Sequence, residues 1–395
     1  MKHIHMKSQI TILIIAGLVV MVLAGFVLYL TKYIADKKAK STVSRSYETS
    51  LDVPKVKEFA TKCVEKLAKD AIVLLGRQGG YIYRSEGGTL MDFANTDIGI
   101  FFINYGSHKV AYDIFPPRNS IPPDYFAEPP AYPWASFPYE TESSTQEIYS
   151  GVFGINTMPP LEPSKGPHSI QSQIESYVDK NMHTCLDFSV MSDKFQIETN
   201  SSSTEVVIGS SDINVRSHMP ITVISISTKQ KAYLDEFSAT LNVRMSKFYS
   251  FAKELIDLEV SDIKFDINST SNDKDSFEVK LEENVYPNDD IITITDSKSM
   301  IYGKPFEYTF ARRDRAPALH YVRNNRLNFP PLHSITLDDL MSGEELRAYD
   351  SDEDELTFTI SPSVPYELDT PAKTFTVEVS DGKLRDWQTI EVIRT

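Results

Sequence analysis

Aspartates stand at every second position of a short acidic run near the C-terminus. Residues 350–354 read Asp-Ser-Asp-Glu-Asp, and a further aspartate precedes a glycine later in the chain. Several carboxylates on one flexible loop suit calcium, because this cation takes six to eight oxygen ligands in loose geometry. We therefore expect a calcium site formed by four aspartates: Asp350, Asp352, Asp354 and Asp381.

The same acidic run has a second interpretation, a solvated loop whose charges repel one another and which binds no metal. An EF-hand shares the opening spacing, but its turn needs glycine where Glu355 stands, and its closing glutamate would fall at Ser361. Strand patterns also flank the run, where an EF-hand has helices. The sequence therefore excludes an EF-hand and leaves the other two interpretations open.

No catalytic motif accompanies the acidic run. The eight histidines are scattered, and no His-Glu-x-x-His or paired His–Cys spacing occurs. A Gly-x-Ser-x-Gly elbow and a phosphate-binding Walker loop are also absent from the sequence. We therefore predict that the protein is not an enzyme, with an uncharacterised ectodomain enzyme or sensor as the alternative.

Strand patterns surround the aspartates and must position them. Apolar and polar residues alternate through 358–360, 375–379 and 390–392, as in strands with one buried face. The charged residues 312–317 are expected to form a linker ahead of these strands. The pattern predicts an all-β domain over residues 316–395, with the acidic run in one of its loops.

This C-terminal part resembles the cadherin-like and immunoglobulin-like repeats of extracellular proteins. Their pattern Ala-x-Asp-x-Asp, followed by Leu-Thr-Phe-x-Ile, begins here at Ala348, and their Val-x-Val-x-Asp-Gly begins at Val377. Asp314–Pro317 is similar to their Asp-Asn-x-Pro linker, although Arg315 replaces the asparagine and no Asp-Arg-Glu triplet is present. The resemblance implies a β-sandwich over 316–395 and a role in adhesion or in contacts with the cell envelope.

Residues 53–311 mix helical and strand patterns without a regular alternation, so an α+β ectodomain is expected. The spacing of apolar residues predicts helices over 51–75, 169–184 and 244–258. Residues 113–167, dense in proline and aromatic residues, are predicted to form a long irregular loop. Short strands are predicted at 194–199, 205–208, 213–216, 221–227, 237–243, 263–267, 277–281, 291–294 and 306–310.

The chain has only two cysteines, Cys63 and Cys185, and each falls within or at the end of a predicted helix. They are either two buried free thiols or one disulfide, which needs an oxidising compartment. Asn200 and Asn268 each open an Asn-x-Ser/Thr triplet, so both are predicted glycosylation sites. A disulfide and glycans are both typical of a protein body outside the cytoplasm.

The longest uncharged apolar run lies at the N-terminus. Residues 10–30 hold no charge, and a helix of that length crosses a hydrocarbon core of about 30 Å. The run is too long for a cleaved signal peptide and lacks the small-residue site that would follow one. We predict a short tail over 1–9, a transmembrane helix over 10–31 and a juxtamembrane segment over 32–52.

Charge is distributed unevenly between the anchor and the body. Residues 1–40 carry +5, whereas residues 41–395 carry −20. An acidic body suits the outside of a cell, away from anionic lipid and nucleic acid. The leading hypothesis is a single-pass cell-membrane protein with an extracellular C-terminal body. Such a protein would contact a protein or glycan partner at the cell surface and would bind no nucleic acid. Homo-oligomerisation is possible under this hypothesis.

The first residues also resemble archaeal type IV pilin-like precursors. The segment 7–11, Lys-Ser-Gln-Ile-Thr, is similar to their start, where cleavage before the glutamine frees an apolar helix that packs into a filament. Leu13 stands where those precursors carry glutamate. Residues 74–82 resemble a segment of uncharacterised archaeal membrane proteins. A pilin-like filament subunit, processed after Ser8, is therefore the second functional hypothesis.

Overall fold

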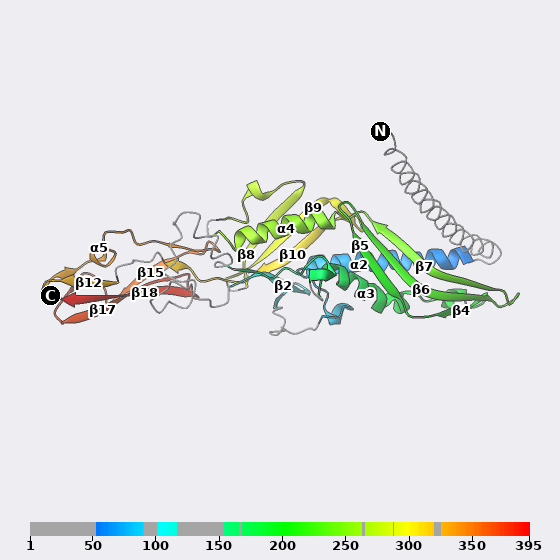
Figure 1. The fold of residues 1–395 in the computed structure, drawn as a ribbon, viewed down its shortest axis with the longest axis horizontal. Coiled ribbons are helices and arrows are strands. Elements are labelled where there is room, and N and C mark those ends of the chain that lie inside the picture. Colours follow the sequence, from blue (N-terminus) through cyan, green and yellow to red (C-terminus); the bar gives the residue numbers. More distant parts are fainter. Residues whose placement is uncertain are drawn as a thin grey trace, which may run out of the picture. The chain divides into compact units, whose positions relative to one another are not determined.

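The computed structural model describes residues 53–90, 101–116, 154–165, 168–262, 265–286, 288–319 and 325–395. Within these ranges the protein has a mixed α+β fold that is rich in strands (Figure 1). The expectation of an α+β fold is confirmed at this level. The predicted tail 1–9, transmembrane helix 10–31 and juxtamembrane segment 32–52 lie outside the described residues. No helix within the described ranges combines the length and apolar character that crossing a membrane requires.

The three predicted helices are present, each with its apolar stripe buried: α2 (Val53–Arg77), α3 (Ile170–Cys185) and α4 (Met245–Glu259). Phe248 of α4, for example, packs edge-on against Phe277 and Phe306 of the sheet beneath it. Short 3-10 helices lie at Arg84–Glu86, Pro163–Lys165, Ser189–Met191 and Thr270–Asn272.

A glycine three residues after the end of helix α2 cannot easily be replaced by another residue. Gly80 has φ +80° and donates its N–H to the carbonyl oxygen of Leu75 at 2.8 Å. A Cβ at this position would lie 2.4 Å from a side-chain carbon of Pro159. Glycine is therefore required both by the left-handed backbone and by the close approach of Pro159.

The described residues form two compact units, and the smaller one contains 53–63, His183–Ser203 and Ser217–Phe237. A disulfide between Cys63 and Cys185 joins α2 to the last residue of α3 in this unit. The disulfide interpretation of the two cysteines is thus confirmed, and the free-thiol alternative is wrong.

One sheet contains a strand that the sequence analysis had divided in two. Its order is β4 (Phe195–Thr199), β6 (Ile213–Ser225) and β5 (Ser203–Ile208), and β7 (Lys231–Leu241) also pairs with β6. Strands had been predicted at 213–216 and 221–227, with a break between them. The structure corrects this, because alternate side chains of β6 are buried without interruption along its whole length.

The larger unit contains a six-stranded sheet beneath α4 (Figure 1). Neighbouring strands are antiparallel except β2 and β10, which run parallel. Its order is β1 (Phe102–Tyr105), β2 (His108–Phe115), β10 (Lys304–Arg312), β9 (Asp289–Ile301) and β8 (Phe277–Tyr286), with β3 (Ile155–Asn156) paired to β2.

Two expectations for this region are corrected. The irregular loop 113–167 was drawn too wide, because Asp113 belongs to β2 and Ile155 to β3, while residues 117–153 lie outside the described residues. The predicted strand 263–267 is absent from its described part, 265–267. There the Asp266 carboxylate accepts the N–H of Asn268, and this local bond favours a turn.

The C-terminal part of the larger unit has its own sheet, and two short strand pairs accompany it. The four-stranded sheet has the order β12 (Arg326–Phe329), β18 (Arg385–Arg394), β17 (Ala372–Ser380) and β15 (Thr357–Ser361). The short pairs are β11 (Ala318–Leu319) with β14 (Ala348–Tyr349) and β13 (Ser334–Ile335) with β16 (Tyr366–Glu367).

A separate hydrophobic core holds these strands together. Its fully buried members include Ile335, Phe375 and Ile390, and all of its buried residues come from residues 319–392. The alternating residues named in the sequence analysis supply much of this core. The expectation of strands alone is corrected at α5 (Leu337–Leu340), a single helical turn with a capping box between Thr336 and Asp339.

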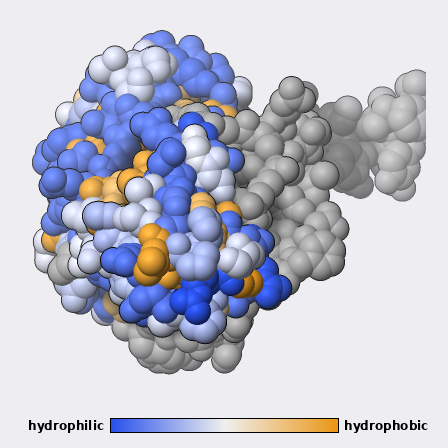
Figure 2. Space-filling model, turned by 90° about the vertical axis from the view of Figure 1, so that its left-hand side faces the viewer, coloured by the Kyte–Doolittle hydropathy of each residue, from blue (hydrophilic) through white to orange (hydrophobic). Residues whose placement is uncertain are grey.

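The surface at the end that carries the C-terminal strands is mostly hydrophilic, with small and separate hydrophobic spots on the face shown (Figure 2). Exposed Leu332 and Phe358 are among the larger apolar side chains of this part. Single exposed apolar residues are ordinary in soluble domains. The described surface on this face therefore suits contact with water.

Candidate metal centre

Three aspartates from distant parts of the chain meet where β10 leads into the C-terminal strands. Asp314 lies between β10 and β11, Asp354 precedes β15, and Asp381 lies in the turn between β17 and β18. One carboxylate oxygen of each lies within 4.8 Å of the other two. Oxygens bound about 2.4 Å from one calcium ion are at most about 4.8 Å apart, so the three separations meet this condition for a shared ion.

The structure therefore brings together two of the four predicted ligands and adds Asp314, which the sequence analysis placed in a linker. Asp314 is only 3% exposed. The sequence analysis named Asp314 only as the first residue of the linker-like segment 314–317. Nothing in the local sequence of Asp314 predicts that it faces two turns from much later in the chain.

Two aspartates of the predicted set each use one oxygen to hold a turn and leave the other without a donor. Asp381 Oδ1 accepts the backbone N–H groups of Lys383 and Leu384, both at 2.6 Å. Asp350 Oδ1 accepts the N–H of Asp352 at 2.8 Å and that of Asp354 at 3.4 Å. The local turns thus orient each carboxylate and leave its second oxygen for another contact.

These second oxygens are buried and accept no hydrogen bond from the described residues. They are Oδ2 of Asp350, Asp354 and Asp381, together with Oδ1 of Asp314. Buried acceptors without a donor are uncommon in folded proteins, and several in one place call for a physical reason. A bound cation would supply that reason, because it satisfies carboxylate oxygens that no N–H reaches.

Burial and mutual repulsion disfavour the charged form of these carboxyls. Burial raises the pKa of Asp314 to about 7, with the charges of Asp381 and Asp352 adding to the shift and Lys383 opposing it. Burial and the charge of Asp352 likewise raise the pKa of Asp350 to about 7 and that of Asp354 to about 6. The Lys383 ammonium lies 3.0 Å from Asp314 Oδ2 and forms an ion pair with it.

We expect the metal-free protein to lose stability as the pH rises from about 4 to 7. A carboxyl whose pKa is raised on folding binds its proton more tightly in the folded state, so its contribution is lost as the pH rises through the raised pKa. The melting temperature in a chelating buffer should therefore fall over this range. In the variant Asp350→Asn/Asp354→Asn the fall should be smaller, because asparagine does not titrate, and an unchanged slope would contradict the assignment.

Asp352, the remaining predicted ligand, is engaged by an arginine. Its Oδ1 accepts from Arg315 Nε at 3.0 Å and Nη2 at 2.6 Å, and its Oδ2 accepts the Arg315 backbone N–H at 2.8 Å. Both side chains are buried. Because both oxygens of Asp352 already have donors, this residue positions the acidic run beside the other aspartates.

The segment expected to be a linker is buried except at Arg313, and a network of ion pairs holds it. Arg312 donates to Glu259 at 2.8 Å and to Asp290 at 2.7 Å, and Arg315 Nη2 donates to the same Glu259 oxygen at 2.6 Å. Two buried arginines thus serve three buried carboxylates, Asp352 included. None of these hydrogen bonds goes to Asp314, Asp350, Asp354 or Asp381.

The two predicted glycosylation sites lie on the surface. Asn200 and Asn268 are both exposed and stand in short connections outside strands and helices. Exposure of the asparagine is a condition for modification of such a triplet. Glycosylation at both positions stays a prediction.

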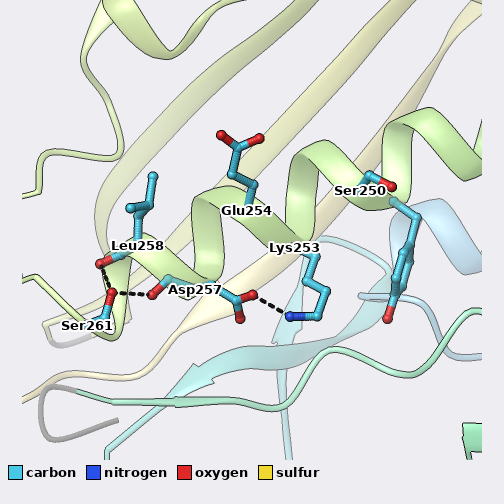
Figure 3. Close-up of a pocket in the computed structure, with 7 residues that line it drawn as sticks. Ser250, Lys253, Glu254, Asp257, Leu258 and Ser261 are labelled. Carbon is cyan, nitrogen blue, oxygen red and sulfur yellow. Dashed lines mark hydrogen bonds and ion pairs between the residues drawn. The ribbon is translucent and has the colours of Figure 1, made fainter. Parts of the chain in front are cut away.

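A hollow of about 420 Å³ on the outer face of α4 is the main alternative site (Figure 3). The Lys253 ammonium and the Asp257 carboxylate point toward each other and form an ion pair, while Glu254 points away. The Ser261 hydroxyl donates to the backbone carbonyl oxygens of Asp257 and Leu258. Since neighbouring groups on one helix already satisfy each other, these residues offer no nucleophile beside a base.

No protein-family model matches this chain, and no curated protein matches it either. Its function must therefore be argued from its own residues and geometry.

Proposed function

We propose that this chain is a single-pass cell-surface protein whose C-terminal β domain is fixed by a bound calcium ion. The observation that carries the proposal is the group of buried carboxylate oxygens of Asp314, Asp354 and Asp381, which accept no hydrogen bond from the described residues. Asp350 lies in the same acidic run and offers a further oxygen of this kind. Together they supply ligands from the segment between β10 and β11 and from two later loops.

The chemistry of the ligand set favours calcium. All the available atoms are carboxylate oxygens, which suit a hard cation, whereas zinc prefers nitrogen and sulfur ligands. Magnesium demands near-ideal octahedral geometry and keeps several waters, so flexible loops from three segments suit calcium better. The bound ion would offset the repulsion between the aspartates and hold both loops to the segment that follows β10.

Two features support the proposed location at the cell surface: the apolar N-terminal run and the disulfide. The apolar run 10–30 would hold the chain in a membrane, and the acidic body is suited to the outside. The disulfide between Cys63 and Cys185 favours an oxidising compartment. An immunoglobulin-like or cadherin-like module at the far end of the chain would then contact a protein or glycan of the cell surface.

Calcium is expected to stabilise the full-length protein, and the variants Asp354→Asn and Asp381→Asn are expected to lose most of that effect. A ligand at a hundredfold excess over its Kd stabilises the folded state by ~2.7 kcal/mol. Thermal unfolding in chelator and in increasing calcium measures the shift. Asp338→Asn, at an exposed carboxylate of the same domain, is the matched control and should respond like the wild type. An equal rise in all variants would indicate general screening of an acidic surface and no site.

Lys383 allows a second discrimination, because its ammonium could itself be the counter-ion of the cluster. If calcium and Lys383 compete for Asp314, Lys383→Gln should lower the Kd for calcium in a titration followed by calorimetry. If Lys383 is the only cation that the cluster uses, Lys383→Gln should destabilise the protein and calcium should not restore its stability. The second result would contradict the metal proposal.

The topology is expected to place residues 41–395 outside the cytoplasm. Protease added to intact cells should then remove the body and leave the anchor. Full protection in cells whose envelope admits the protease would contradict this topology. Sequencing of the mature N-terminus adds a second test, since a start at Gln9 would support the pilin-like filament subunit.

A further inference from the structure

We infer that a hollow between α2 and the β9–β10 hairpin binds a free α-amino acid with an apolar side chain. The hollow has a volume of about 200 Å³ and lies within the larger unit. Its lining combines apolar side chains with charged groups of both signs: Val73, Ile301, Phe306, Arg77, Lys304 and Glu307. The hollow shares no residue with the metal centre, so it does not depend on the calcium proposal.

The wall formed by the end of α2 lies very close to β10. A Cβ at Gly76 would lie 2.2 Å from the carbonyl oxygen of Glu307 and 2.9 Å from a ring carbon of Phe306. Only glycine permits this approach of the helix to the strand. The next residue, Arg77, ends α2 and is therefore held near the part of β10 that carries Glu307.

The opposite wall is fixed by Tyr302 at the tip of the hairpin. Its hydroxyl donates to Asp70 Oδ1 at 2.7 Å and lies 3.3 Å from the carbonyl oxygen of Lys66, so the tip is joined to α2. The side chain nevertheless stays 58% exposed and lines the hollow. Both walls are thus formed before a ligand arrives, which lowers the entropy that binding costs.

The backbone of Tyr302 gives a separate reason to assign a role to this tip. Tyr302 and Gly303 form the turn between β9 and β10, with φ of +52° and +74°. A two-residue turn that needs positive φ at both positions favours Asn-Gly. A bulky residue is uncommon in this left-handed region, and residues held there are frequent at ligand-binding sites.

The charged groups of the lining are free to contact a ligand. Arg77, Lys304 and Glu307 are exposed, and within the described part of the chain none of them forms an ion pair or a side-chain hydrogen bond. Elsewhere on α2 the charges are paired, as between Lys66 and Asp70 at 2.7 Å. The hollow therefore offers two cationic groups and one anionic group together.

An α-amino acid matches charges of both signs, because it carries a carboxylate and an ammonium on the same carbon. The Arg77 guanidinium, assisted by Lys304, suits the carboxylate, and the Glu307 carboxylate suits the ammonium. A simple anion would meet the repulsion of Glu307, and a simple cation that of Arg77. Both signs in the lining therefore select a zwitterion.

The floor of the hollow selects an apolar side chain on that ligand. Ile301 and Phe306 are only 5% and 2% exposed, and Val73 of α2 adds to the same apolar lining. Covering such a surface with an apolar group is favourable because it removes water from it. The volume is below the roughly 300–1,000 Å³ of pockets for drug-sized ligands, which suits a ligand as small as one amino acid.

Calorimetric titration of the full chain in detergent micelles, with ligands at millimolar concentration, tests the site. The probes are L-leucine and L-phenylalanine, with two truncated forms of leucine: 4-methylpentanoate lacks the ammonium, and 3-methylbutylamine lacks the carboxylate. We expect at least one of the two amino acids to bind. Loss of a charge-assisted hydrogen bond weakens binding roughly tenfold or more, so both truncated forms should bind at least that much more weakly than leucine.

Two variants separate the roles of the charges. Arg77→Gln should weaken leucine binding roughly tenfold, whereas Glu307→Gln should bind leucine and 4-methylpentanoate about equally. The matched controls are Lys247→Gln and Glu278→Gln, at exposed residues of the larger unit that do not line the hollow. All four sites are exposed, so the melting temperature without ligand should stay close to that of the wild type in each variant.

Three results would overturn the amino-acid site: no binding of either amino acid, equal binding of leucine and 4-methylpentanoate by the wild type, or equal losses in the control variants. Asp354→Asn and Asp381→Asn, which remove calcium ligands, should bind leucine like the wild type. Calcium-dependent stability without amino-acid binding would therefore overturn this site alone. Amino-acid binding without a calcium effect would support this site and contradict the metal centre.

Discussion

Replacing Arg315 by methionine is expected to destabilise the protein by about 3–5 kcal/mol. Arg315 is fully buried and donates to Asp352 and to Glu259, both of which are also buried. Methionine leaves two buried carboxylates short of a donor, and an uncompensated buried charge is far less favourable than a paired one. The unfolding midpoint in urea, with and without calcium, measures the loss.

The matched control is Arg313→Met, two positions earlier in the same segment. The Arg313 side chain is 45% exposed, and its Nε lies 3.8 Å from Asp289, so its removal should change stability by less than about 1 kcal/mol. The double variant Arg315→Met/Asp352→Asn should recover part of the loss, because it removes one of the stranded charges. Equal effects for Arg313→Met and Arg315→Met would contradict the role of the buried network.

Arg315→Met should also weaken calcium binding, through the link between Arg315 and the acidic run. Arg315 holds Asp352, and the N–H of Asp352 donates to Asp350 Oδ1. Loss of the arginine therefore loosens the turn that orients the Asp350 carboxylate. A variant with lower stability but unchanged calcium affinity would show that the network and the metal centre are independent.

Removal of the disulfide, in the variant Cys63→Ala/Cys185→Ala, is expected to destabilise the protein by up to ~5 kcal/mol. The two cysteines are 122 positions apart, and in the chain-entropy model a loop of this length restricts the unfolded chain by about that amount. Cys63 is also almost fully buried on α2, so the smaller alanine removes packing there. Urea unfolding of the oxidised wild type and of the double variant measures the difference.

Reduction of the wild type is the control for this variant, because it opens the loop without changing the cysteine side chains themselves. The reduced wild type and the double variant should unfold at similar urea concentrations. Alkylation of both thiols in the native, non-reduced protein, detected by mass spectrometry, would contradict the disulfide. A Cys63→Ala/Cys185→Ala variant as stable as the oxidised wild type would show that the bond contributes nothing to stability.

The sequence by itself determined the three long helices, many of the strands and half of the buried residues of the C-terminal core. Periodicity is a local property of the sequence. Apolar residues at helical spacing, or apolar and polar residues that alternate along a strand, favour burial of the apolar face whichever element packs against it. For this reason α2, α3 and α4 were predicted within two residues at each end. The same reasoning divided β6 in two. The local break in its apolar pattern gave no information about the neighbouring strands that pair with β6 in the sheet.

Tertiary structure alone decided how the aspartates are used. Asp350, Asp352 and Asp354 look equivalent in the sequence, but the Arg315 side chain, 37 positions before Asp352, donates hydrogen bonds to the Asp352 carboxylate. Asp314 joined Asp354 and Asp381 because the end of β10 meets two later loops. Whether a carboxylate oxygen faces an arginine or is left for a cation depends on which donors the folded chain brings within about 3 Å, and spacing along the chain does not contain that information.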